Sequence, residues 1–342
     1  MTAPPARRGV GHAPCHHGEI LQGVFLDAGG RRCAGLVTLP MTGPGSRAEF
    51  TRRPGTAPER IAVLPDGRTK AARAAALAVA ECAPRCQETP CGGELRIVSD
   101  IPVGLGMGSS TSDVIAVVRA VADSYGVRLA PDTIARLAVR AETACDPLML
   151  DARPVLFAQR EGRVLEVLGP RLPPLVVVGC ALGGGAPVDT LSLPVPAHDA
   201  SDVRAFERLR ALLRRAVATG DAALLGRVAS ASARRGQQRL RHREFDTLTD
   251  IGRRLGAVGV QIAHSGAVAG LLLDPATRGL RHRVRSCVRA LESNGIAATR
   301  TFTTFPTRPH TNREFPSGPA HRGGHRPTGP DTPRRAARLP AL

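Results

Sequence analysis

One stretch rich in glycine and serine constrains this chain more than any other feature. Residues 101–113 read Ile-Pro-Val-Gly-Leu-Gly-Met-Gly-Ser-Ser-Thr-Ser-Asp, and they lie between a strand-like run at 94–98 and a valine pattern of helical spacing at 111–125. Glycine allows close approach of the backbone to an anion and positive φ, and a helix start presents unpaired N–H groups. The stretch therefore predicts a phosphate-binding turn, although an ordinary strand-to-helix turn can show the same glycines.

Two common phosphate-binding loops do not fit this stretch. A Walker loop needs lysine before its serine or threonine, and Lys70, the single lysine of the chain, lies outside the stretch. A dinucleotide fingerprint needs an acidic residue about 20 residues further on, at the end of the next strand. Asp123 has that separation but falls inside the predicted helix. Both alternatives are therefore set aside.

The stretch resembles the central motif of the GHMP small-molecule kinases, Pro-x-Gly-x-Gly-x-Gly-Ser-Ser-x-Ser. The resemblance implies that this loop binds the phosphates of ATP. The matching residues are Pro102, Gly104, Gly106, Gly108, Ser109, Ser110 and Ser112.

Two further segments resemble the other motifs of that family. Residues 14–23, Pro-Cys-His-His-Gly-Glu-Ile-Leu-Gln-Gly, are similar to the first motif in its Cys-Gly-Glu-Leu-Leu-Gln-Gly form, found in bacterial L-threonine kinases of the propanediol-utilisation and cobalamin-synthesis type. Residues 260–271 resemble the third motif in the His-Ser-Gly form of the same subgroup. The chain is thus identified as a GHMP kinase closest to that subgroup. The resemblance makes five residues candidates for substrate binding: Glu19, Gln22, His264, Ser265 and Gly266.

The acidic residues expected to act in phosphoryl transfer follow a helix predicted over residues 131–142. Residues 141–151 resemble the Glu-Pro-Thr-Asp stretch of threonine-kinase-like members, with one extra residue between the acids and no proline. By this resemblance Glu142 is the candidate Mg²⁺ ligand, together with Ser110, and Asp146 is the candidate base. Asp151 remains an alternative for the second role. Homoserine-kinase-like members lack a catalytic Asp, so the reaction need not depend on either.

The resemblance implies an α+β fold of two lobes, with the active site between them. Residues 11–169 are expected to form an N-terminal lobe like domain 2 of ribosomal protein S5, and residues 170–300 a ferredoxin-like C-terminal lobe. The prolines of residues 170–174 mark the boundary. Residues 301–342 hold eight prolines and seven arginines against two acids, which predicts a disordered tail.

The net charge of +18 offers a different interpretation, a nucleic-acid-binding protein. Arginine-rich segments at 204–215 and 234–243 favour it, but aromatic residues make up only 3% of the chain, and single-stranded binders use aromatics for stacking. A single lysine among 47 basic residues indicates coding bias, so a nucleic-acid partner is not expected. A third alternative is a kinase fold without activity, if the C-terminal elements are incomplete.

The function predicted from the sequence is ATP- and Mg²⁺-dependent phosphorylation of a small alcohol, with L-threonine as the preferred substrate. Homoserine, an isoprenoid precursor or a secondary-metabolite precursor remain alternatives. Eight cysteines are too few for a disulfide scaffold in 342 residues, and adjacent His16 and His17 would point to opposite sides of a strand rather than hold zinc together. Without an apolar run of about 20 residues or a secretory signal, we expect a cytoplasmic enzyme that does not contact a membrane.

Overall fold

The computed structural model describes residues 7–151, 153–185, 198–264 and 267–305. Its strands are β1 (Arg8–Leu26), β2 (Arg32–Arg52), β3 (Ile61–Leu64), β4 (Gly93–Ser99), β5 (Val155–Ala158), β6 (Arg163–Val167), β7 (Val176–Ala181), β8 (Gly259–Ile262), β9 (Val268–Leu273) and β10 (Ala297–Thr303). Its α-helices are α1 (Thr69–Cys82), α2 (Ser109–Ser124), α3 (Pro131–Glu142), α4 (Ala200–Thr219), α5 (Ala222–Gly236), α6 (Phe245–Leu255) and α7 (Leu280–Ser293). No helix in this described part is long and apolar enough to cross a membrane.

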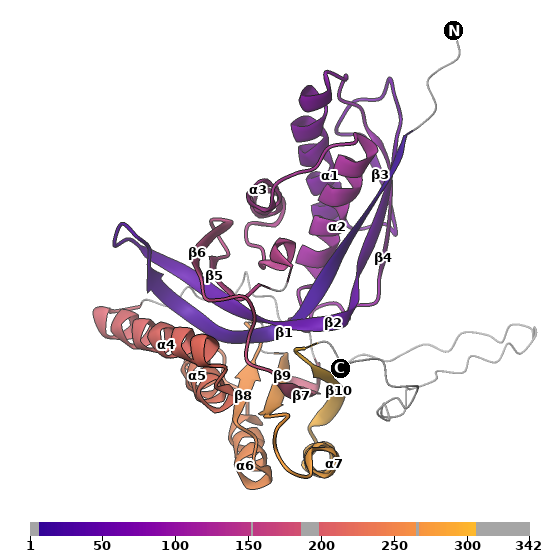
Figure 1. Cartoon of the computed structure of the whole chain (residues 1–342). Helices are drawn as coiled ribbons and strands as arrows, with labels where there is room; N and C mark the ends of the chain where they lie inside the picture. The colour runs from indigo at the N-terminus through magenta and orange to yellow at the C-terminus, as the bar shows by residue number, and fades with distance from the viewer. Residues whose placement is uncertain (1–6, 152, 186–197, 265–266, 306–342) are drawn as a thin grey trace, which may run out of the picture.

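One sheet runs through both lobes in the order β10-β7-β9-β8-β1-β2-β4-β3, and the hairpin β5–β6 adds to β2 (Figure 1). The long strands β1 and β2 pair along most of their length and curve from one lobe into the other. β1 meets β8 through a single pair, Glu19 opposite Ile262. Glu19 therefore lies where the strands of the two lobes join.

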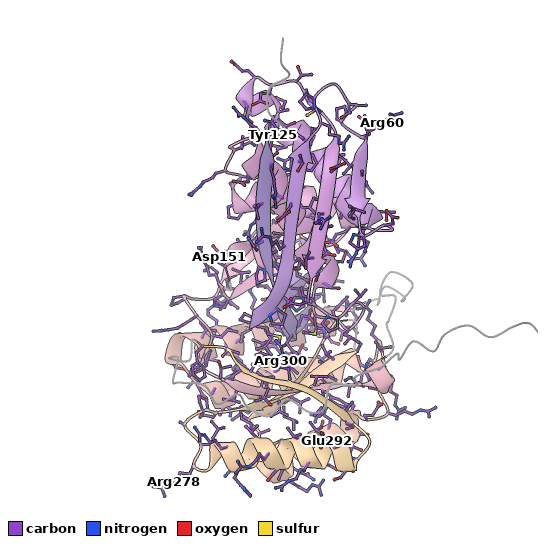
Figure 2. All side chains as sticks on the ribbon, turned by 90° about the vertical axis from the view of Figure 1, so that its right-hand side faces the viewer. Arg60, Tyr125, Asp151, Arg278, Glu292 and Arg300 are labelled. Carbon is purple, nitrogen blue, oxygen red and sulfur yellow. The ribbon has the colours of Figure 1, made fainter. Side chains whose placement is uncertain are left out.

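The first lobe packs α1, α2 and α3 on one face of β1, β2 and β4 (Figure 1). Leu95 and Ile97 of β4 point into this core, whereas Arg96 and Val98 are exposed on the other face, which Figure 2 shows without a covering layer. Helix α2 lies at the centre and is buried on nearly every side. Its run of valines and alanines has the composition that a buried helix requires. The first turn of α2 is thereby held rigidly beside the glycine loop.

The second lobe places β7, β8 and β9 between two layers of helices. Val177 belongs to the core shared with α4 and α5, and its neighbours Val176 and Val178 belong to the core shared with α6 and α7. Strands buried on both faces read as continuous apolar runs, as Val-Val-Val does here. The two lobes thus have separate cores that meet along the curved strand β1.

The predicted α+β architecture is present, and the prediction of a helix over residues 131–142 is confirmed by α3. Helix α1 lies in a region for which no element was expected from the sequence. The start of the predicted tail is wrong by at least three residues. β10 pairs with β7 as far as Thr303, and Thr304 N donates to Leu175 O at 3.1 Å. The rest of that segment from residue 306 lies outside the described residues.

Candidate functional site

A cavity of about 360 Å³, here called the loop cavity, opens between the glycine loop and β1. Its lining comes from the irregular part of β1, the start of α1, the glycine loop with the first turn of α2, and the end of α3 with the chain after it. Residues of β2, the β5–β6 turn and the chain after β8 complete it. The lining residues expected from the sequence are Glu19, Gly104, Gly106, Gly108, Ser109, Ser110, Glu142, Asp146 and His264. Lining residues that were not expected from the sequence include His16, Lys70, Thr111, Gln159 and Arg160.

The glycine loop adopts backbone conformations that side chains disfavour. Gly104, Gly106 and Gly108 have φ of 80°, 81° and 70°. Gly108 precedes α2, and no side chain caps this end of the helix. A Cβ on Gly108 would lie 2.5 Å from Cδ2 of His16, so glycine is required for space as well as for conformation. The first turn of α2 therefore lines the cavity with backbone N–H groups that no described side chain caps.

Glu142, the last residue of α3, is buried beside the start of α2. Its two carboxylate oxygens accept hydrogen bonds from Ser110 Oγ at 2.6 Å and Thr111 Oγ1 at 2.7 Å. Burial raises the pKa of Glu142 to about 7, opposed by these two hydroxyls. Lys70 Nζ lies 3.5 Å from Ser110 Oγ. A buried carboxylate beside a serine hydroxyl is an oxygen donor set that suits a hard divalent cation.

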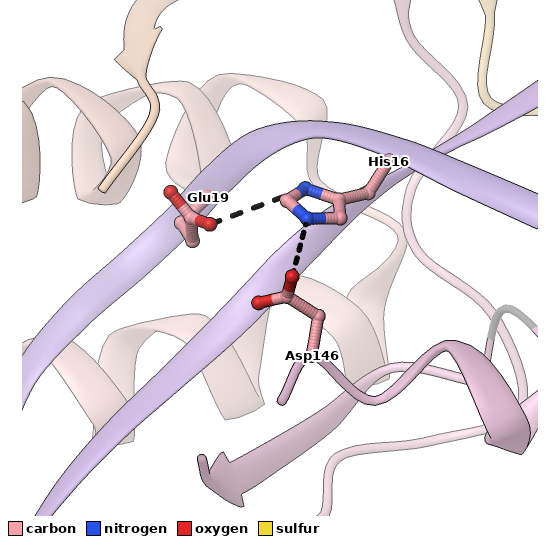
Figure 3. Close-up of side chains that lie close together, drawn as sticks. All are labelled: His16, Glu19 and Asp146. Carbon is pink, nitrogen blue, oxygen red and sulfur yellow. Dashed lines mark ion pairs between the residues drawn. The ribbon is translucent and has the colours of Figure 1, made fainter. Parts of the chain in front are cut away.

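His16 and Asp146, which also line the loop cavity, form an ion pair (Figure 3). His16 Nε2 lies 3.0 Å from Asp146 Oδ2, and Nδ1 lies 3.2 Å from Gly18 O and 4.0 Å from Glu19 Oε1. The register of β1 against β2 shifts between His16 and Glu19 and again before Leu21, and Gly18 has φ of 67°. Such bulges redirect side chains beside functional sites. The bulge turns both His16 and Glu19 toward Asp146.

The charges of this cluster depend on one another. Burial disfavours the imidazolium of His16, but the negative charge of Asp146 and a smaller contribution from Glu19 outweigh it and raise the pKa of His16 to about 9. Burial also acts on Asp146, yet the attraction of His16 dominates and lowers its pKa. Burial raises the pKa of Glu19 to about 8. At neutral pH the cluster therefore holds a charged His16–Asp146 pair and a protonated Glu19.

His264 connects this cluster to the second lobe. Its backbone N–H donates to Glu19 Oε2, and its ring Nδ1 lies 2.7 Å from Gln22 Oε1. Arg239 Nη1 lies 2.8 Å from His264 Nε2. Since arginine can only donate, Nε2 is the acceptor and Nδ1 carries the proton. Burial and Arg239 lower the pKa of His264 to about 4, in agreement with a neutral ring.

The structure places some expected residues outside the loop cavity. Pro102 is exposed beside it, and Ser112 is buried with its hydroxyl donating to Ala13 O at 3.0 Å. Gln22 lies next to the cavity through His264, and Ser265 and Gly266 lie outside the described residues. Asp151 is 90% exposed at the side of the molecule, 3.9 Å from Arg119 (Figure 2).

His16 could have been suspected from the sequence because it lies inside the first motif, and Lys70 because it is the single lysine.

Among the described residues, the side chains His16, Glu19 and Asp146 have ligand atoms within 4.8 Å of one another, the spacing of a metal site. The imidazolium already compensates the Asp146 charge there, so we treat the group as an ion-pair cluster. His17 turns elsewhere, with Nδ1 3.3 Å from Gln261 Nε2 and its ring against Phe302.

Comparisons with known proteins agree with the sequence motifs. Residues 70–152 match the GHMP kinases N terminal domain. The L-threonine kinase of Citrobacter freundii is 28% identical over 190 residues, which are 52% of this chain and 61% of that protein. The chain thus aligns with about three fifths of the length of this curated relative.

Solved structures show the same fold over most of the chain. The homoserine kinase of Cytophaga hutchinsonii superposes with a TM-score of 0.61 and 15% identity, covering 89% of this chain and 96% of that one. The phosphomevalonate kinase of Streptococcus pneumoniae gives a TM-score of 0.59 and 14% identity, covering 86% and 98%. The predicted two-lobed fold is confirmed. Residues 70–152 thus match the N-terminal domain of the GHMP kinases, and the chain shares the fold of the kinases on which it superposes.

Proposed function

We propose that the protein transfers the γ-phosphoryl group of ATP to the hydroxyl of a small amino-acid-like alcohol, with L-threonine as the preferred substrate. The observation that carries the proposal is the composition of the loop cavity. An uncapped glycine loop, the buried carboxylate Glu142 and the His16–Asp146 pair all line it. These are the parts that phosphoryl transfer needs: a phosphate cradle, a cation ligand and a group that orients the attacking hydroxyl.

The phosphates of ATP bind along residues 104–112 in this proposal. The N–H groups at the start of α2 and the hydroxyl of Ser109 donate to phosphate oxygens. Lys70, beside Ser110, adds a positive charge at the same edge. Glu142 and Ser110 would hold a Mg²⁺ ion, which would supply positive charge against the phosphates.

Asp146 accepts a hydrogen bond from the substrate hydroxyl and orients it toward the γ-phosphorus. The oxygen–phosphorus bond forms, the bond to the β-phosphate oxygen breaks, ADP leaves, and the hydroxyl proton passes to Asp146. The ion pair with His16 keeps Asp146 ionised, which makes it a weak base but a constant acceptor. A loose phosphoryl-transfer transition state needs orientation of the nucleophile more than its early deprotonation.

Two observations support an amino-acid-like alcohol as substrate. The first motif has the form found in L-threonine kinases, and the curated relative in Citrobacter freundii has that activity by name. The fold alone is shared with kinases of homoserine and phosphomevalonate. A panel of alcohols therefore tests the substrate: L-threonine, L-serine, L-homoserine and mevalonate, each with Mg-ATP and coupled detection of ADP. L-Threonine should give the highest kcat/KM, and a preference for mevalonate would contradict the substrate assignment.

A further inference from the structure

A second cavity of about 230 Å³, here called the arginine cavity, adjoins the loop cavity. It lies between β1, the β5–β6 turn and the C-terminal end of α5. Gln159, Arg160 and His264 line both cavities, so the two meet along these residues. Arg235 and Arg239 line the arginine cavity alone. Arg160 therefore lines the same cavity as Asp146, and Arg239 contacts His264 in the shared lining.

The arginines of this cavity differ in how their charges are compensated. Arg235 pairs with Asp202 at 3.2 Å and lies over the ring of Phe206. Arg160 and Arg239 have no carboxylate within 4.0 Å in the part of the chain that the structure describes. Burial and the like charge of Arg160 lower the pKa of Arg239. Two neighbouring guanidinium groups without an anion are unfavourable, and a bound anion would relieve that repulsion.

The hydrogen bonds of Arg239 indicate where such an anion belongs. Nη1 donates to the neutral ring of His264, which Gln22 fixes from the other side. That contact positions the guanidinium without neutralising it. The buried Nε has no hydrogen-bond partner among the described residues. Arg239 is thus oriented in advance, with donor capacity to spare.

Gln159 supplies a second unsatisfied group between the two cavities. The residue is only 9% exposed, and its Oε1 has no hydrogen-bond partner among the described residues. Its backbone carbonyl accepts from Cys145 N at 2.9 Å, which holds it next to Asp146. An acceptor oxygen at this place suits a ligand N–H group, such as an ammonium.

We infer that Arg239, together with Arg160, binds the carboxylate of an amino-acid substrate whose ammonium group donates to Gln159 and whose hydroxyl reaches Asp146. The inference rests on the proposed function and adds the groups that select an α-amino acid. Bidentate guanidinium–carboxylate pairing is strong and directional, so it also fixes the distance from carboxylate to hydroxyl.

Binding can be measured apart from turnover. The full chain is saturated with Mg²⁺ and a non-hydrolysable ATP analogue, and L-threonine and L-threoninamide are titrated by calorimetry. The amide keeps the hydroxyl and the ammonium group but lacks the negative charge. We expect L-threonine to bind about 10- to 100-fold more tightly than the amide, the range of a charge-assisted hydrogen-bonded contact.

Variants test which residues cause the preference for L-threonine over L-threoninamide. Arg239→Gln should weaken L-threonine to the affinity of the amide and leave the amide unchanged. Arg160→Gln, on an exposed side chain that folding tolerates, should reduce the preference in part. Arg234→Gln changes an exposed arginine of the same helix α5 and should keep the full preference.

Equal affinity for L-threonine and its amide, absence of binding by both, or an unchanged preference in both arginine variants would overturn the inference. Inorganic phosphate that displaces L-threonine from the wild type but not from Arg239→Gln would assign the arginines to a phosphate and overturn the carboxylate assignment. A carboxylate preference in binding without any phosphorylation of L-threonine would support the inference and refute the proposed function.

Discussion

His16 Nε2 lies 3.0 Å from Asp146 Oδ2, and this contact joins the bulge of β1 to the chain that follows α3. The imidazolium is almost completely buried, and its charge is compensated chiefly by Asp146. Each residue therefore fixes the protonation state of the other. Asp146, which we propose orients the substrate hydroxyl, is therefore held in position by His16, a residue of the first motif.

Replacing His16 by glutamine should reduce activity while the fold persists. Without the imidazolium the pKa of Asp146 rises and its carboxylate is less well fixed, so we expect kcat to fall about 10- to 100-fold. The acidic limb of the pH–kcat profile should move to higher pH in the same variant. His12→Gln, an exposed position on the same strand, is the matched control. An unchanged acidic limb in His16→Gln would refute the coupling.

The same ion pair predicts how stability depends on pH. The pKa of His16 is raised in the folded protein to about 9 from an ordinary 6.5, so its contribution is complete below about pH 6.5 and is lost as the pH rises through 9. Urea denaturation from pH 6 to pH 10 should show the free energy of unfolding of the wild type falling by about 1–3 kcal/mol relative to His16→Gln. If the free energy of unfolding depends on pH in the same way in both proteins, His16 is not charged as we assign it.

Alanine at Gly108 should damage the site more than the same change at Gly126. Both glycines have positive φ, 70° and 67°, so both variants share a backbone strain of about 1–2 kcal/mol. A Cβ meets nothing within 4 Å at Gly126 but lies 2.5 Å from His16 at Gly108. Gly108→Ala should therefore lose kcat and the thermal stabilisation by Mg-ATP, whereas Gly126→Ala loses only stability. Equal activity of the two variants would show that the close approach has no role.

Replacing Glu142 by glutamine should weaken the proposed Mg²⁺ site and thereby reduce activity. Glutamine is close in shape and can still accept a hydrogen bond from Ser110 or Thr111, so the helix contact is kept. We expect kcat/KM to fall about 10²- to 10³-fold and the apparent affinity for Mg²⁺ to weaken. Asp151→Asn, on an exposed side chain outside the cavity, should change neither quantity. A loss of activity in Asp151→Asn with full activity in Glu142→Gln would contradict the assignment of Glu142.

Local signals were enough to predict the parts of the fold that depend on neighbouring residues. The turn predicted at the glycine–serine loop and the helix predicted over residues 131–142 both correspond to observed elements. The place of Glu142 beside Ser110 followed from family resemblance, and the structure brings the two within hydrogen-bond distance.

What the sequence did not predict depends on long-range pairing. The bulge that redirects His16 exists because β1 pairs with β2 on one side and meets β8 at Glu19 on the other. β10 is an edge strand with mostly polar residues, Ala-Ala-Thr-Arg-Thr-Phe-Thr, so its composition resembles the segment after it more than a strand. Arg239 approaches His264 only in the folded second lobe. None of these contacts leaves a periodic pattern in the sequence.

The central claim is phosphoryl transfer to an amino-acid hydroxyl oriented by Asp146, and a single-turnover experiment followed by phosphorus NMR tests it directly. Enzyme in excess over ATP is mixed with Mg²⁺ and L-threonine, for the wild type and for Asp146→Asn. We expect the wild type to form one phosphomonoester of threonine for each ADP, and the variant to form it at least 10-fold more slowly. ADP formation without a phosphothreonine signal, or equal rates in the two proteins, would contradict the account.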